Sequence, residues 1–268
     1  MCSCTDRNYL LGEQYRDATN IKARAQIYRY ETNGQDWHTW LFGHLPALAR
    51  ARVIETGCGD GALWRKNAAR VPHGWEIVLT DVSPGMLAAA ADIPALLACS
   101  CRTVQADAEA LPFADGSFDV VLANHMLYHV QDRARAIREA RRVLRPQGTL
   151  LASTPGRANT QELLELIDAA AESVAKAEPA HWCFCLENGA AQLQAVFDDV
   201  QRYELHGCLE VPDAEPVVRY AASTGRLSNA ELVALRAEVV RRIADHGSLR
   251  ITTHVGVFAA RGAQAPSD

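Results

Sequence analysis

The sequence has no dense block of lysine and arginine residues, and its 32 acidic residues outnumber its 27 basic ones. A net charge of −5 does not create the basic surface that nucleic acids require, so we expect a small-molecule substrate and no nucleic-acid partner. No stretch approaches the roughly 20 apolar residues of a membrane helix, and residues 1–7 lack the apolar core of a signal peptide. We therefore expect a cytoplasmic protein without a membrane partner. A single sequence does not separate interface from core, which leaves the oligomeric state open.

The eight cysteines do not form the C-x₂₋₄-C pairs that zinc sites generally use. A chain of this size also needs no disulfides in a reducing compartment. We interpret the thiols as unremarkable and predict no metal; a metal or redox role that His181 or His206 joins is the alternative. Three cysteine pairs share the unusual spacing C-x-C: Cys2 with Cys4, Cys99 with Cys101, and Cys183 with Cys185.

The length of 268 residues suits one large core, and hydrophobic residues (49%) and charged residues (22%) occur in globular proportions. Apolar residues recur at helical spacing before residue 45, and we find no internal repeat. We therefore predict a helical N-terminal cap over residues 1–45 and a main domain over residues 46–268.

One segment of about 30 residues organises the main domain. Residues 52–56 predict a buried strand, Gly57 and Gly59 turn the chain sharply into a helix, and residues 76–80 predict a second strand that ends at Asp81. A strand, a glycine turn, a helix, a strand and a terminal acid form the first half of a doubly wound sheet that binds a nucleoside.

The charges of the glycine turn bear on which nucleoside it binds. The turn satisfies the G-x-G-x-x-A form of the dinucleotide fingerprint, and Asp81 lies at about the distance at which an acid meets the ribose hydroxyls, so NAD must be considered. However, Glu55 precedes the turn and Asp60 lies within it, where a pyrophosphate needs positive potential. S-adenosylmethionine carries an ammonium and a sulfonium and only one carboxylate, so it suits this acidic turn better.

The remaining chain continues the alternation of strands and helices. Ser83 and Asp132 are expected to cap two of the helices, and Ser228 with Glu231 to cap a long one. We predict an α/β fold with a doubly wound, mostly parallel, seven-stranded Rossmann-like sheet. The later strands are expected at residues 104–108, 118–123, 149–153, 200–211 and 249–260.

A long helical connection is expected at about residues 157–200. Asn159 and Glu162 predict a capping box at its start. A connection of this length between strands is typical of a substrate lid, so we predict a helical lid here.

Five segments in fixed order resemble class I S-adenosylmethionine-dependent methyltransferases, in particular the small-molecule group of ubiquinone/menaquinone methylases and natural-product methyltransferases. The resemblance covers roughly residues 50–155 closely and the flanks loosely. Any one segment is weak evidence, whereas five in order are strong. The segments are 55–61 (ETGCGDG), 80–87 (TDVSPGML), 106–113 (ADAEALPF), 118–129 (from FDVV to His129) and 143–148 (VLRPQG).

The resemblance implies S-adenosylmethionine as the cofactor and a role for each matching residue. Gly57 and Gly59 would let the backbone approach the methionine part, with Glu55 near its ammonium. Asp81 would accept hydrogen bonds from both ribose hydroxyls. Val82 would lie against the face of the adenine, and Asp107 and the N–H of Ala108 would bind its edge. The main chain of Asn124 would hold the amino group. Tyr15 of the cap is expected to join this site.

The sequence indicates the catalytic residue less directly than the cofactor residues, because the cofactor supplies the electrophile and the protein mainly aligns the reactants. His125 and His129 lie where the fourth strand opens at its carboxyl end, as site residues of such sheets do. In similar O-methyltransferases a histidine at the place of His129 is the proposed base, so we predict His129 as the base and His125 as second choice. The competing interpretation is that His129 only packs against the following helix.

Three other functions stay open at this point. The same pocket could transfer or cyclise the aminocarboxypropyl group of the cofactor and release methylthioadenosine. An NAD-dependent oxidoreductase is disfavoured by Glu55 and Asp60 and by the lack of a Tyr-x-x-x-Lys pair. A non-catalytic binding module is disfavoured by the intact cofactor segments. We predict methyl transfer to a hydroxyl, amine, thiol or carbon atom of a small metabolite.

Overall fold

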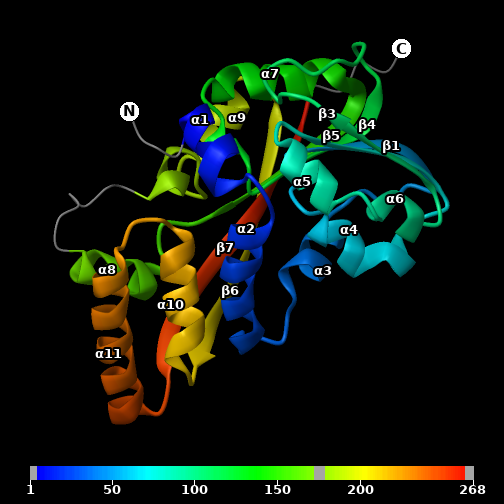
Figure 1. Ribbon diagram of the computed structural model, residues 1–268. Coiled ribbons are helices and arrows are strands. Elements are labelled where there is room, and N and C mark those ends of the chain that lie inside the picture. Colours follow the sequence, from blue (N-terminus) through cyan, green and yellow to red (C-terminus); the bar gives the residue numbers. More distant parts are fainter. Residues whose placement is uncertain (1–4, 172–178, 263–268) are drawn as a thin grey trace.

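The computed structural model describes residues 5–171 and 179–262 (Figure 1). Residues 172–178 of the predicted lid lie outside these ranges. The strands are β1 (Arg50–Thr56), β2 (Gly74–Asp81), β3 (Ser100–Gln105), β4 (Phe118–Asn124), β5 (Leu144–Pro155), β6 (Asp199–Val211) and β7 (Leu249–Arg261). The helices are α1 (Arg7–Tyr9), α2 (Thr19–Ala25), α3 (Trp37–Phe42), α4 (Ala62–Asn67), α5 (Pro84–Ala89), α6 (Ile93–Leu96), α7 (Arg133–Val143), α8 (Gln161–Ala170), α9 (Gly189–Gln194), α10 (Ala214–Ser223) and α11 (Asn229–His246).

The strands form one seven-stranded sheet in the order β3-β2-β1-β4-β5-β7-β6. The first five strands run parallel, and β7 lies antiparallel between β5 and β6. Helices cover both faces of the sheet. The central strands are therefore buried on both sides, and their sequences are nearly continuous apolar runs. The predicted doubly wound, mostly parallel, seven-stranded sheet is thereby confirmed.

Local capping signals are confirmed at three helices. Ser83 Oγ accepts a hydrogen bond from Met86 N at 3.3 Å at the start of α5, and Asp132 accepts one from Arg135 N at 2.9 Å at the start of α7. Ser228 and Glu231 form a complete capping box at α11. Each cap satisfies backbone N–H groups that the first turn of a helix leaves without a partner.

The capping box predicted at Asn159 and Glu162 is wrong. Asn159 Oδ1 accepts from the backbone N–H of His254 at 2.9 Å, and the Glu162 carboxylate accepts from the N–H and the hydroxyl of Thr252 at 2.9 and 2.6 Å. Both side chains therefore link the start of α8 to β7. They bind N–H groups of this strand, which is distant in the sequence, instead of the N–H groups of their own helix.

The third strand begins earlier than the predicted residues 104–108. It pairs with β2 from Glu76↔Ser100 to Asp81↔Gln105, and Asp107 follows in a tight bridged turn with Ala110. β3 is an edge strand whose side chains are mostly exposed, so it lacks the apolar alternation from which a strand is predicted.

A helical layer is built on the far ends of β6 and β7, which extend beyond the sheet. These strands pair from Asp199↔Arg261 to Val211↔Leu249, whereas β5 accompanies β7 only as far as Val255. In Figure 1, α8, α10 and α11 lie beside this extension. A separate core joins them to the N-terminal segment through buried side chains that include Ile27, Leu163, Leu209, Val217 and Leu235.

None of the helices within the described residues is both long enough and apolar enough to span a membrane.

Candidate active site

The candidate site lies at the carboxyl ends of β1, β2 and β4. These neighbouring strands are parallel, so the loops that follow Thr56, Asp81 and Asn124 leave the sheet at one edge. Ligands of open α/β sheets bind at such an edge. Every cofactor residue predicted in the main domain lies on one of these loops, on the loop after β3, or within the last two residues of a strand.

The glycine turn after β1 adopts a conformation that side chains resist. Gly57 and Gly59 have φ values of 65° and 56°, in the left-handed region that favours glycine. A Cβ atom on Gly57 would lie 2.8 Å from Cβ of Met126, so this position also has no room for a side chain. The turn therefore brings the backbone close to the loop that carries Met126, and the N–H of Cys58 is bound by the carbonyl of Thr80 at the end of β2.

Asp81 holds the glycine turn in place. Its carboxylate accepts from the N–H of Gly59 at 3.0 Å and from the N–H of Ser83 at 2.8 Å. Burial raises the pKa of Asp81, whereas these backbone hydrogen bonds lower it. The structure thus brings together Gly57, Gly59 and Asp81, as the sequence predicts for a nucleoside site.

Glu55 lies inside the protein against α4. Only 1% of the residue is exposed, and Oε2 accepts from Nε1 of Trp64 at 2.5 Å. Burial raises the pKa of Glu55 to about 8, and the negative charges of Asp81 and Asp60 add to the increase. The carboxyl group is therefore largely protonated at neutral pH. Trp64 was not singled out by the sequence, although its place one turn after the glycines is a signal.

The predicted adenine residues surround the loops after β2 and β3. Val82, Asp107 and Ala108 are half-buried. Asp107 accepts from the N–H of Glu109 at 2.9 Å and forms an ion pair of 2.7 Å with Arg7 of α1. The N-terminal segment therefore reaches the edge where an adenine would lie, a contact that the sequence did not reveal.

Asn124 and His125 are organised by Ser153 at the end of β5. The Ser153 hydroxyl donates to Oδ1 of Asn124 at 2.6 Å and accepts from the N–H of His125 at 3.0 Å. His125 has a φ of 52°, a left-handed conformation that is uncommon for a residue with a side chain and that clusters at functional sites. The sequence analysis missed Ser153, whose only signal is its place at the carboxyl end of a strand.

The two predicted catalytic histidines have different environments. Burial and, to a smaller extent, the neighbouring His38, His181 and His129 lower the pKa of His125 to about 3. His125 is therefore neutral at physiological pH and a weak base. Its ring packs 4.9 Å from that of Trp37.

His129 instead contacts Tyr15 of the N-terminal cap. The Tyr15 hydroxyl lies 2.7 Å from Nε2 of His129, and the Tyr15 carbonyl accepts from Ser83 Oγ at 2.7 Å. Burial raises the pKa of Tyr15, so the phenol keeps its proton. A protonated phenol can donate to Nε2 of His129 in the tautomer that carries its proton on Nδ1.

Two buried polar atoms beside these histidines have no hydrogen-bond partner within the described part of the chain. They are Nε1 of Trp37, a donor, and Nε2 of His181. Burial lowers the pKa of His181 to about 4, so its ring is neutral and Nε2 can accept. His181 also lies beside Tyr128, with 6.4 Å between the ring centroids. Because unsatisfied buried polar groups are costly, they are typical of a place where a ligand completes the hydrogen bonding.

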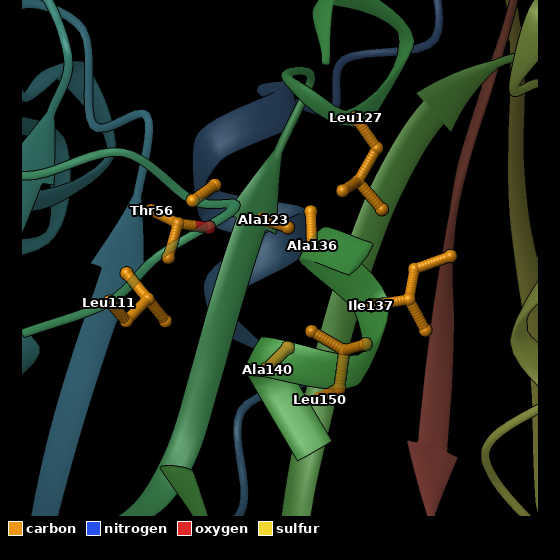
Figure 2. Close-up of a pocket in the computed structure, with 9 residues that line it drawn as sticks. Thr56, Leu111, Ala123, Leu127, Ala136, Ile137, Ala140 and Leu150 are labelled. Atoms are coloured by element: carbon orange, nitrogen blue, oxygen red, sulfur yellow. The ribbon is translucent and has the colours of Figure 1, made fainter. Parts of the chain in front are cut away.

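A small cavity lies between α7 and the sheet, apart from these groups. Figure 2 shows Ala136 and Ala140 of α7 beside Ala123 of β4 and Leu150 of β5. Its volume of about 10 Å³ holds at most one water molecule, and its lining is mostly apolar. It is a packing gap and not a substrate site.

Comparison with known proteins identifies relatives of the segment that carries most of this site. Residues 54–152 match the family described as methyltransferase domain. The chain is 36% identical over 126 residues to a malonyl-[acyl-carrier protein] O-methyltransferase of Enterobacter lignolyticus, a match that covers 46% of each chain. It is 41% identical over 110 residues to a ubiquinone/menaquinone biosynthesis C-methyltransferase of Ectopseudomonas mendocina, covering 39% of this chain and 43% of that protein. The chain thus spans less than half the length of these curated relatives.

Solved structures share the fold over nearly the whole chain. Phosphoethanolamine N-methyltransferase 2 of Haemonchus contortus, solved in complex with S-adenosyl-L-methionine, superposes with a TM-score of 0.60 at 20% identity. The superposition covers 98% of this chain and 61% of that one. The N-terminal and C-terminal flanks, in which sequence similarity is loose, therefore belong to the same fold.

Proposed function

We propose that this chain, whose residues 54–152 belong to the methyltransferase-domain family, transfers a methyl group from S-adenosylmethionine to a small-molecule acceptor. One observation carries the proposal. The matched segment contains the predicted cofactor residues from Glu55 to Asn124, and they lie on neighbouring loops at one sheet edge. Ordered segments alone could be inherited without function, but the meeting of these residues at one edge of the sheet supports a retained binding site.

The residues of the turn fit this cofactor. Gly57 has no room for a Cβ atom, and Asp81 binds the N–H of Gly59 while lying beside the edge where a ribose would bind. Asp107 and Ala108 would receive the adenine edge and Asn124 the amino group. When bound, S-adenosylmethionine supplies an electrophilic methyl group. Asp60 adds negative potential that favours a cationic ligand over a pyrophosphate, whereas the largely protonated Glu55 adds little.

Tyr15 and His129 are proposed to remove the proton of the acceptor. Tyr15 already occupies Nε2 of His129, so an acceptor hydroxyl would pass its proton to the Tyr15 oxygen while the phenol proton moves to His129. The phenol then never carries a full negative charge, which its buried position would disfavour. His125 is assigned a positioning role, because a group with a pKa of about 3 is a poor base at neutral pH.

The acceptor atom is proposed to be oxygen or nitrogen. Nε1 of Trp37 offers a donor beside His125 and Nε2 of His181 an acceptor beside Tyr128, and a ligand with hydroxyl or amine groups can satisfy such atoms. A carbon or thiol acceptor would leave these atoms poorly paired. The curated relatives are named for malonyl-[acyl-carrier protein] and for ubiquinone/menaquinone biosynthesis, which supports an organic acceptor.

The segment at about residues 157–200 stays a proposed lid. Of its described residues, Cys183 Sγ donates to the carbonyl of Tyr128 at 3.3 Å, so this segment touches the loop that carries His129.

The test follows both nucleoside products of the purified chain, incubated with S-adenosylmethionine and a metabolite extract, by mass spectrometry. Methyl transfer predicts S-adenosylhomocysteine and one extract component heavier by a methylene group. Trp37→Phe, which removes the donor and keeps an aromatic ring, should slow the reaction, whereas the matched control Trp40→Phe should not. Methylthioadenosine above the spontaneous rate would instead indicate aminocarboxypropyl chemistry and overturn the proposal.

A further inference from the structure

A cluster on the β6–β7 ribbon is separate from the proposed methyl-transfer chemistry. Glu204 and His206 lie two residues apart on β6, and His254 pairs directly with His206 across the ladder. Side chains at such positions share one face of a sheet. One ligand atom from each of the three lies within 4.8 Å of the others, and no other such group occurs within residues 5–171 and 179–262.

The three side chains converge on one carboxylate oxygen. Oε2 of Glu204 lies 2.6 Å from Nε2 of His254 and 3.4 Å from Nε2 of His206. The two imidazole rings are stacked, with 4.3 Å between centroids and 13° between planes. Tetrahedral ligands at about 2.1 Å from a zinc ion lie roughly 3.4 Å apart, so small rotations of these side chains suffice to enclose a metal.

The surroundings hold two of the three groups in place. Arg202 Nε binds Oε1 of Glu204 at 2.9 Å, which leaves Oε2 directed at the imidazoles. The backbone N–H and carbonyl of His254 are both engaged, by Asn159 and by the N–H of Gly156. A Cβ on Gly156 would lie 2.3 Å from Nδ1 of His254, so only glycine allows this ring position. Hydrogen-bonded supports of this kind are typical around metal ligands.

Access and chemistry indicate a divalent transition metal. The His254 side chain is 14% exposed and that of Glu204 26%, whereas His206 is 69% exposed, so an ion can enter from the side of His206. Two imidazoles and one carboxylate suit zinc, which three protein ligands bind with a fourth position open to water. A bound ion would replace the hydrogen bond between His254 and Glu204.

We infer that Glu204, His206 and His254 form a zinc-binding site that fastens the β6–β7 ribbon. No metal was predicted from the sequence, because the cysteines lack the spacing of zinc ligands. Glu204 and His254 are 50 residues apart and form no recognisable ligand pattern. The register of the antiparallel ladder brings the three residues together, and no spacing of ligand residues in the sequence indicates the cluster.

The experiment is a calorimetric titration of zinc into EDTA-treated protein without a histidine tag, repeated with cobalt to record its visible spectrum. One zinc per chain is expected, with affinity reduced more than about tenfold in Glu204→Gln and in His254→Ala. The control His246→Ala changes an exposed histidine of α11 outside the cluster and should bind as the wild type does.

Three results would overturn the inference. They are the absence of saturable binding, wild-type affinity in both variants, and a thiolate-to-cobalt charge-transfer band, which would place the metal on cysteines instead. Glu204→Gln keeps the size of the side chain and one acceptor oxygen for Arg202, so its effect reports on ligation even if His254→Ala folds poorly. Because binding is measured directly, the outcome is independent of the proposed methyl transfer.

Discussion

The Tyr15 hydroxyl lies 2.7 Å from Nε2 of His129, although 114 residues separate the two. One belongs to the segment before the first strand and the other to the turn after the fourth. Their contact joins the N-terminal cap to the carboxyl edge of the sheet, and it places a protonated phenol on the imidazole nitrogen that a base would use.

If the pair acts as one proton relay, either single substitution should interrupt it. We expect Tyr15→Phe and His129→Asn each to lower kcat by about 100-fold, and the double variant to be no slower than the singles. The measurement is S-adenosylhomocysteine formation at saturating cofactor. Multiplicative losses in the double variant would show that the residues act separately, and an unchanged Tyr15→Phe would remove the phenol from the relay.

Asp81 fixes the glycine turn and is proposed to bind the ribose. Asp81→Asn keeps the shape but weakens charge-assisted hydrogen bonds worth about 1.5–3 kcal/mol, so we expect affinity for S-adenosylmethionine to fall roughly 10- to 100-fold. Calorimetry of cofactor binding measures this. Asp92→Asn, in which only an exposed ion pair with Arg65 is lost, should bind normally. Equal affinities in the two variants would contradict the ribose role.

A comparison of alanine substitutions at Gly57 and Gly116 distinguishes steric overlap from backbone strain. Both have positive φ, 65° and 62°, but a Cβ on Gly57 meets Met126 at 2.8 Å whereas one on Gly116 meets nothing within 4 Å. Gly116→Ala should cost about 1–2 kcal/mol of unfolding free energy from strain alone, and Gly57→Ala about 1–3 kcal/mol more from overpacking. Urea unfolding compares the two. Equal losses would mean that the Met126 side chain moves aside without cost.

Glu55 predicts a pH dependence of stability with a definite sign. Its pKa of about 8 in the folded protein exceeds the unfolded value of about 4.3, so between these values the folded state holds a proton that the unfolded chain has lost. Stability from this group is therefore fully present below about pH 4 and declines as pH rises towards 8, by at most about 1.4 kcal/mol per pH unit.

The comparison of wild type with Glu55→Gln isolates this contribution. The difference in unfolding free energy between the two proteins, measured in urea at pH 5.5 and pH 8, should move in favour of the variant at the higher pH. A difference that does not change with pH would show that Glu55 is ionised in the folded protein.

Short-range sequence signals were sufficient to predict the start of a helix where the capping side chain contacts only its own helix. Ser83, Asp132 and the Ser228–Glu231 pair cap the helices that follow them, because a side chain there can reach only the first turn of its own helix. The same logic failed at Asn159 and Glu162, which bind N–H groups of β7 instead. The helix α10 was not predicted, since its burial depends on a core shared with distant helices.

The sheet, the glycine turn and the acids that follow the strands could be predicted from the sequence, because apolar runs, glycines and their spacing act over a few residues. The partners of those loops depend on the folded chain: Arg7 at Asp107, Tyr15 at His129, Ser153 between Asn124 and His125, and His254 beside Glu204. The reason is physical. Strand register and the packing of the cap bring together side chains far apart in the chain, and burial then sets their pKa values, as it does for Glu55 and His125.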